Sequence, residues 1–158
     1  MTLPPFQVLI DEHAVELHRY VTVVAGRDGA DDAFQDVMVA ALRAYAGLQD
    51  DRNLKGWLFT VAHNQTIDRH RRRARRPSEV ALVAAGGVPS PEGSPTSSDE
   101  SGLWEAVAEL PDKQRDAVVL RFVADLPYKD VASMLGGTEA AARQNVREAL
   151  KNLRQEVE

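Results

Sequence analysis

The stretch KGWLFTVAHNQTIDRHRRRARRP, from Lys55 to Pro77, is the part of the chain from which the rest is interpreted. It begins with the apolar spacing of a helix, passes through a polar segment at residues 63–65 that predicts a hinge, and ends in a cluster of arginines. Between residues 64 and 76, six arginines stand against the single acid Asp68, in a chain whose formal net charge is -5. A local inversion of charge of this kind indicates a polyanionic partner.

The bulk composition limits the class of protein. A chain of 158 residues accommodates one ordinary domain or two small ones. It has no cysteine, which excludes disulfides and thiolate metal sites and fits a reducing compartment. No apolar run is long enough to span a membrane, and the N-terminal residues lack the basic start of a secretory signal. We therefore expect a cytoplasmic protein without membrane insertion.

Charge is unevenly distributed along the chain. Residues 1–76 hold 11 basic and 10 acidic side chains, residues 77–102 hold none and 4, and residues 103–158 hold 8 and 10. A protein that coats DNA without specificity is basic throughout. We therefore expect this chain to bind DNA weakly alone, or only with the help of a partner.

The first 76 residues read as helices. Residues 6–24 and a segment that runs to about Tyr45 have helical apolar spacing, and Asp31 or Asp32 is expected to cap the second helix. A polar loop at 47–53 precedes a third helix, and a further turn or helix begins at Ile67 and runs into the arginines. The apolar stripe of the third helix consists of Leu54, Trp57, Leu58 and Val61. Trp57 is therefore expected in the core, and Phe59 is expected to pack rather than to stack on a base.

The composition changes from Pro77 to Gly102. Proline, glycine and serine dominate, basic residues are absent, and the apolar periodicity is lost. Such a segment cannot bury a core and predicts a flexible acidic linker. The sequence therefore indicates an all-α protein with two small helical domains, residues 1–76 and 103–158, joined by the linker 77–102.

The second domain has the pattern of a helix-turn-helix. A helix is predicted over 103–110, and a second is expected to begin with Asp112 as its cap. The side chains expected to point inward from this second helix are Val118, Val119, Phe122 and Val123. A short helix at 128–135, a tight Gly136-Gly137 turn and a last helix capped by Thr138 and ending at about Arg154 complete the pattern.

The arginine cluster is the first candidate site. Arginine forks match phosphate oxygens, and each neutralised phosphate releases counterions, so contact with a nucleic-acid backbone is the favoured interpretation over a solvated basic face. The residues concerned are Arg69, Arg71, Arg72, Arg73, Arg75 and Arg76.

The polar segment before the arginines is the second candidate. The amide of Asn64, with His63 and Gln65 beside it, can donate and accept together and so match the edge of an exposed base. Asparagine is also a good helix cap, and on the residues alone capping is the favoured interpretation of Asn64.

Two helix faces are further candidates. On the last helix Arg143, Gln144 and Arg147 are expected to point outward and could reach base edges and phosphates, although a plain surface helix is the alternative because basic and acidic residues balance there. The second helix carries a polar face with one apolar residue in its middle, which is as compatible with ordinary solvated surface as with a protein-binding face. Its members are Asp32, Gln35, Asp36, Val39 and Arg43.

No catalytic constellation is visible in the sequence. The four histidines lack metal-ligand spacing with acids on a common face, and no glycine-rich phosphate loop precedes a helix. We therefore expect no cofactor, no metal and no enzymatic activity.

The motifs in their order resemble those of a known family. Residues 31–77 resemble region two of the extracytoplasmic-function (ECF) sigma factors of bacterial RNA polymerase, through Gln35-Asp36, Trp57-Leu58, Asn64, Ile67-Asp68 and the arginines. Residues 103–154 resemble region four, through Leu110-Pro111, Arg115, Val119-Leu120, Arg121 and the helix-turn-helix. The resemblance covers nearly the whole chain outside the linker.

This resemblance implies a set of partners and roles. The face from Asp32 to Arg43 would dock on the clamp of core RNA polymerase, and the loop 49–53 with Asn64 would hold a base flipped out of the minus-ten element of promoter DNA. Region four would read the minus-thirty-five element, the acidic linker would follow the RNA exit path, and an anti-sigma factor is a possible further partner. The implied DNA contacts of region two are Asn53, Lys55, His63, Asn64 and the six arginines; those of region four are Thr138, Arg143, Gln144 and Arg147.

The chain departs from the family pattern in the last helix. It has three alanines at 140–142 and Glu148 where a basic residue is common, which predicts weak DNA binding by region four and more reliance on the polymerase. Two other functions stay open on the sequence. A stand-alone helix-turn-helix regulator would need a dimerisation seam, for which no coiled-coil pattern is seen, and a helical adaptor would need no basic patch.

Overall fold

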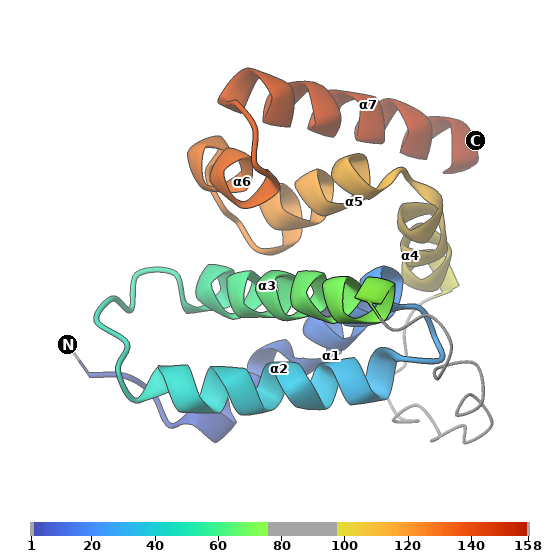
Figure 1. Ribbon diagram of the computed structural model, residues 1–158. Helices are drawn as coiled ribbons and strands as arrows, with labels where there is room; N and C mark the ends of the chain where they lie inside the picture. The colour runs from blue at the N-terminus through green and yellow to red at the C-terminus, as the bar shows by residue number, and fades with distance from the viewer. Residues whose placement is uncertain (1, 76–97, 158) are drawn as a thin grey trace. The chain divides into compact units, whose positions relative to one another are not determined.

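The structure is a computed structural model that describes the backbone of residues 2–75 and 98–157, with side chains from 2–68 and 102–155. Every regular element in these two ranges is a helix, which confirms the predicted all-α fold class (Figure 1). The described residues fall into two compact units, one on each side of the undescribed residues 76–97. The first is called unit 1 and the second unit 2.

Unit 1 is a bundle of three helices, α1 (Phe6–Ala25), α2 (Ala30–Tyr45) and α3 (Leu54–Arg75), each of which packs on the other two. The helices form because apolar residues recur at the spacing that places them on one face. The fully buried side chains contributed to this core are Leu17, Tyr20, Val21, Val37, Ala41, Leu58, Phe59 and Ala62. The predicted core position of Phe59 is confirmed, and Trp57 is partly buried against Tyr45, with ring centroids 5.9 Å apart.

The junction between α1 and α2 differs from the expectation in one respect. Gly26 ends α1 with a φ of 83°, a conformation that glycine adopts without steric strain. The expected cap by Asp31 or Asp32 is wrong, because α2 begins at Ala30 and Gly29 occupies the cap position without a side-chain bond. Both acids lie instead in the first turn of α2, where their negative charges interact favourably with the positive end of the helix dipole.

The third helix is continuous through the segment predicted as a hinge. Residues 63–65 and Ile67 lie within α3, so neither the hinge nor a separate helix after it exists. The helix continues because His63 and Thr66 face the core, 2 % and 1 % exposed, and the Thr66 hydroxyl donates to the His63 carbonyl at 2.8 Å. The burial of these polar side chains, and not their polarity, decides the local structure.

Unit 2 contains α4 (Ser98–Glu109), α5 (Asp112–Val118), the π-helical segment η2 (Val119–Val123), α6 (Tyr128–Leu135) and α7 (Glu139–Val157). The long helix α7 packs on α4, α5 and α6 (Figure 1). Helix α4 begins five residues before the predicted helix, so residues 98–102 are helical and not part of the linker. The rest of the predicted linker, residues 77–97, lies outside the described residues, so its flexibility stays a prediction.

Two local predictions in unit 2 are wrong. Asp112 does not cap α5, because Pro111 holds that position and Asp112 pairs instead with Arg115 at 3.1 Å. Phe122 is 58 % exposed rather than inward, because η2 bonds residues five apart, with the Ala124 N–H donating to the Val119 carbonyl at 3.1 Å. The wider turn rotates Phe122 out of the face that an α-helix would have buried.

The helix-turn-helix itself is as predicted. Helix α6 has the expected bounds and ends at Gly136, whose φ of 73° and ψ of 32° are those of a left-handed helix cap. Thr138 caps α7 by accepting a hydrogen bond from the Ala141 N–H at 3.1 Å. The inward side chains predicted by helical spacing on α7 are Ala142, Val146, Ala149, Leu150 and Leu153, and all of these except Leu150, which is partly exposed, are buried.

Candidate nucleic-acid interface

The start of α3 is built by Asn53. Its side-chain oxygen accepts the Gly56 N–H at 2.9 Å, and its carbonyl accepts the Trp57 N–H at 3.0 Å. Asn53 is exposed, so the predicted DNA-contacting residue also acts as the cap of the helix. The loop before α3 is thereby fixed to the helix that carries Asn64 and the arginines.

Within the same loop, Arg52 donates several hydrogen bonds to the carboxylate of Asp50. The Arg52 backbone N–H and Nε both lie 3.0 Å from Asp50 Oδ1, and Arg52 Nη2 lies 2.7 Å from Oδ2. The hydrogen bonds from Arg52 lower the pKa of Asp50 to about 2 from its ordinary 3.8, and those to Asp50 raise the pKa of Arg52. Both side chains are exposed, so the pair orders the loop without burying charge.

Lys55 fastens α3 to α1. Its Nζ lies 2.6 Å from Oε2 of Glu16, and its side chain is 29 % exposed. The contact of Lys55 with DNA stays a prediction, and such a contact would have to compete with this ion pair.

His63 belongs to the core of unit 1. Its ring is 2 % exposed and its Nδ1 lies 3.1 Å from the hydroxyl of Tyr20 on α1, whose ring packs on Phe59 with centroids 5.5 Å apart. This burial corrects the prediction that His63 contacts DNA. The pair instead holds α3 on α1 and so fixes the direction in which the next residue points.

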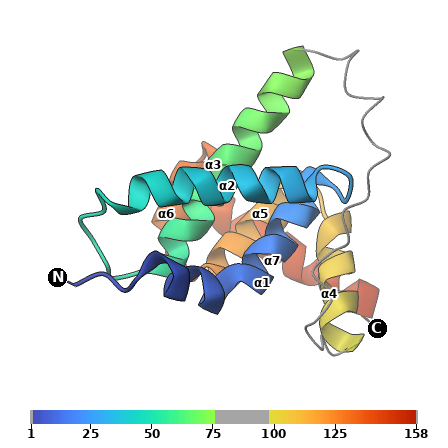
Figure 2. The same cartoon turned by 90° about the horizontal axis from the view of Figure 1, so that it is seen from below.

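Asn64 is exposed within α3. The favoured interpretation of Asn64 as a helix cap is wrong, since ten residues of the same helix precede it and it caps neither end. Figure 2 shows the C-terminal part of α3 projecting beyond α1 and α2. The side chains of the predicted arginines lie outside the described residues, although the helix that carries them is described as far as Arg75.

The predicted protein-binding face of α2 is on the surface of unit 1. All of its members are at least partly exposed, and Val39 at its centre is 48 % exposed. Leu42, which the sequence reasoning missed, is 57 % exposed on the same helix. The α2 face thus combines two exposed apolar side chains with polar neighbours, and its role as a protein-binding face stays a prediction.

In unit 2 the outward face of α7 carries Arg143, Gln144 and Arg147, all exposed as predicted. Two of these side chains have acidic neighbours one turn away. Arg143 Nη2 lies 3.5 Å from Glu139 Oε2, and Gln144 Nε2 lies 3.0 Å from Glu148 Oε1. The structure thus places these residues in the first half of one helix, with one carboxylate beside Arg143 and one beside Gln144.

The sequence did not predict that Arg143 is held in place by an aromatic side chain, that of Tyr128. Its guanidinium carbon lies 5.1 Å from the ring centroid of Tyr128, and that of Arg121 lies 5.0 Å from the same ring. Cations over an aromatic face are held by the ring quadrupole. Tyr128 therefore orients two arginines, and the only sequence signal was an aromatic residue at the first position of α6.

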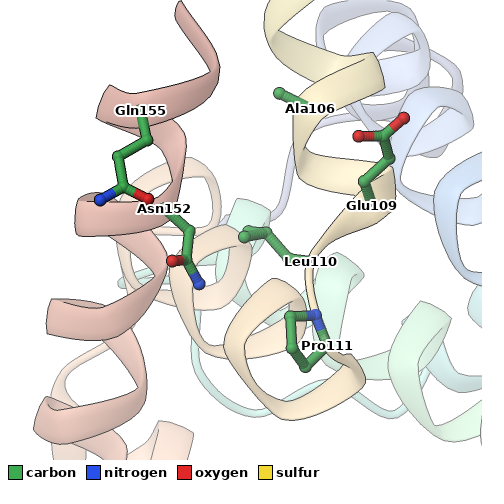
Figure 3. Close-up of a pocket in the computed structure, with 6 residues that line it drawn as sticks. All are labelled: Ala106, Glu109, Leu110, Pro111, Asn152 and Gln155. Carbon is green, nitrogen blue, oxygen red and sulfur yellow. The ribbon is translucent and has the colours of Figure 1, made fainter.

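A shallow hollow of about 210 Å³ lies between α4 and the C-terminal half of α7 (Figure 3). It is lined by Ala106, Glu109, Leu110, Pro111, Asn152 and Gln155. Within the described ranges, no group of three or more histidine or acidic side chains is placed to hold a metal ion. None of the helices in those ranges has both the length and the hydropathy needed to cross a membrane.

Comparison with known proteins identifies both units. Residues 9–76 match the model of sigma-70 region 2, and residues 101–153 match that of sigma-70 region 4. The chain is similar to the ECF RNA polymerase sigma factor EcfG of Rhodopseudomonas palustris, 26% identical over 84% of this chain and 74% of the relative. It is also similar to SigL of Mycobacterium tuberculosis, 29% identical over 94% of this chain and 86% of the relative.

The fold has a close counterpart among solved structures. The sigma factor RpoE from Bartonella quintana, solved in complex with the anti-sigma factor NepR, has a TM-score of 0.71. The two are 23% identical, and the match covers 96% of each chain. At this level of identity the likeness supports the two-domain helical architecture.

The order of a region-two bundle and a region-four helix-turn-helix defines the class of protein. The chain belongs to the sigma-70 family. Within that family it is an ECF sigma factor, a subunit that directs DNA-templated transcription initiation.

Proposed function

We propose that unit 1 docks on core RNA polymerase through the exposed face of α2 and captures an unstacked base of the minus-ten element beside Asn64. The observation that carries this proposal is that buried His63 and exposed Asn64 are consecutive residues of the same helix. Because the His63–Tyr20 contact anchors the helix, Asn64 has a fixed position next to the arginine-bearing end.

Energetic reasoning supports a role in promoter opening. Unstacking a base requires a few kcal/mol. Hydrogen bonds from an asparagine amide to the exposed base edge offset part of this, and contacts between arginines and the adjacent phosphates hold the strand. Asn53 and the Asp50–Arg52 loop lie at the start of the same helix and would form the remaining wall of the base pocket.

Unit 2 would read the minus-thirty-five element through Arg143, Gln144 and Arg147 at the start of α7. The capped turn before α7 and the stacking of Arg143 on Tyr128 support this assignment. Since acids compensate this helix, unit 2 would depend on the polymerase for much of its affinity.

The remaining features of the proposal concern partners and chemistry. The protein would act in the cytoplasm and make or break no covalent bond itself. An anti-sigma factor is a further expected partner, because the Bartonella quintana relative was solved with one. Of the alternatives, an adaptor without DNA contact is disfavoured by the two family matches, and a stand-alone regulator is disfavoured by their order.

The experiment is transcription from a promoter library by the purified chain with core polymerase. Defined start sites that need both components are the expected result. Asn64→Ala should lower open-complex formation by about tenfold, the value of one bidentate base contact, and leave core binding unchanged. Gln7→Ala, an exposed amide on α1, is the matched control and should change neither.

Core docking is tested with a matched pair of exposed valines. Val39→Asp on α2 should weaken core binding at least tenfold by placing a charge in the contact, whereas Val15→Asp on α1, where the valine is 46 % exposed, should not. Equal effects of the two valine variants, or equal loss of core binding and opening in Asn64→Ala, would contradict these assignments.

A further inference from the structure

Glu148 on α7 accepts hydrogen bonds from two glutamine side chains. Its Oε1 lies 3.0 Å from Nε2 of Gln144, one turn earlier on α7, and its Oε2 lies 3.2 Å from Nε2 of Gln114 on α5. Gln114 Oε1 in turn accepts from Nδ2 of Asn152 at 2.8 Å. The four side chains form one continuous network between α5 and α7, the two packed helices seen in Figure 1.

The carboxylate of Glu148 sets the direction of every bond in this network. An ionised glutamate has only acceptor atoms, so each glutamine has to turn its NH₂ group toward it and not its carbonyl. Gln114 then has its carbonyl left for Asn152, and that is the bond found. The orientation of the Gln144 amide therefore follows from chemistry and is not an arbitrary choice between oxygen and nitrogen.

This orientation leaves Gln144 with a defined outward face. A glutamine amide has two N–H donors and one carbonyl acceptor, and Glu148 takes one of the donors. Gln144 is exposed near the start of α7, on the helix that follows the capped turn. One donor and one acceptor are left to meet a ligand.

Adenine is the base whose major-groove edge matches this pair. It presents the N7 acceptor beside the N6 donor, and a glutamine amide can bond both. Guanine presents two acceptors, N7 and O6, and would need the donor that Glu148 holds. Cytosine and thymine each offer a single polar group in that groove and so can form only one bond.

We propose that Glu148 is a positioning residue that fixes the Gln144 amide to select adenine at one position of the minus-thirty-five element. This inference rests on the proposed function of unit 2. The negative charge of the carboxylate lowers the attraction of α7 to the DNA backbone. The same carboxylate restricts which base the Gln144 amide can bind with two hydrogen bonds.

The test uses Glu148→Gln in the full chain with core polymerase, on a promoter library randomised across the minus-thirty-five element. The introduced amide can donate, so the Gln144 carbonyl can turn toward it and both Gln144 N–H groups can face the base. Adenine preference at one position should fall about tenfold and guanine should gain there, since a bidentate pair supplies discrimination of this size. Binding to unrelated duplex DNA should rise about twofold, because a negative charge is removed.

Three controls separate positioning from a structural or general charge effect. Glu105→Gln removes the same charge from an exposed site on α4 and should leave base preference unchanged. Gln144→Ala should abolish the adenine preference, and adding Glu148→Gln to it should change preference no further. Thermal unfolding of each variant detects a merely structural defect, which would lower activity at every promoter without a change of preferred base.

The outcomes are distinct from those of the proposed function. If the wild-type chain gives no core-dependent start sites, the proposed function fails. If start sites form but adenine is not preferred, or Glu148→Gln leaves every base preference within twofold, this inference alone is overturned.

Discussion

Helices α3 and α7 are both proposed to meet promoter DNA, but they carry charge in opposite ways. Residues 64–76 hold six arginines and a single acid, whereas residues 138–158 hold four basic and four acidic residues. On α7 the acids lie one turn from the reading residues, as in the Glu139–Arg143 and Glu148–Gln144 contacts. We infer from this comparison that unit 1 would supply attraction to DNA and strand capture, while unit 2 would supply base selectivity.

The largest effect should follow removal of charge from α3. The triple change Arg71→Gln, Arg72→Gln and Arg73→Gln should lower promoter affinity of the holoenzyme by about two orders of magnitude and reduce the salt slope by roughly 0.9 for each phosphate that is no longer neutralised. Filter binding across salt concentrations measures both quantities. The matched triple on α7 changes its exposed cations Arg147, Lys151 and Arg154 to glutamine and should have a much smaller effect. Equal effects would remove the distinction between the helices.

A medium effect is expected from the anchor of α3. His63→Ala should lower the free energy of unfolding of unit 1 by about 2–3 kcal/mol, because it removes core packing and the hydrogen bond to Tyr20. Urea denaturation followed by tryptophan fluorescence measures this in a Trp104→Phe background, in which Trp57 of unit 1 is the remaining tryptophan. His13→Ala, a partly exposed histidine on α1, serves as the control and should change stability by less than about 1 kcal/mol. A result in which both variants unfold alike would mean that His63 does not anchor the helix.

The smallest effect concerns the loop before α3. The pKa of Asp50 is about 2, below its ordinary 3.8, because Arg52 donates hydrogen bonds to the carboxylate. A lowered folded-state pKa means that the pair contributes fully above about pH 4 and is lost as the pH falls through 2. A carboxyl-carbon NMR titration should give this midpoint, and Arg52→Gln should return it toward 3.8. A midpoint for Asp50 that does not change in Arg52→Gln would show that the pair does not order the loop.

Much of the fold could be predicted because its signals are local. The bounds of α6, the left-handed Gly136 and the Thr138 cap follow from residues within one or two turns. The failures had non-local causes. The hinge was expected from polar residues at 63–65, but Tyr20, 43 residues earlier, accommodates His63 in the core. Phe122 was misplaced because its face depends on the π-helical bonding of η2.

The candidate site was predictable by residue type and less so by arrangement. The exposure of Asn64 and of the α7 reading residues follows from helical spacing. The partner of Glu148 on α5 is 34 residues away in sequence, so nothing in the local pattern indicates that Gln114 helps to orient Gln144. Likewise, the stacking of Arg121 and Arg143 on Tyr128 depends on how α6, α7 and η2 meet.

The division of labour between α3 and α7 is tested most directly by one promoter-opening assay. Fluorescence of a base analogue in the minus-ten element reports opening by the holoenzyme, on promoters that carry either adenine or guanine at the Gln144 position. The account predicts that Asn64→Ala lowers opening on both promoters and keeps their ratio. Glu148→Gln should instead change the ratio, and it should leave opening undiminished on whichever of the two promoters this variant opens better. If both variants lower opening alike and leave the ratio unchanged, the two helices do not divide the work in this way.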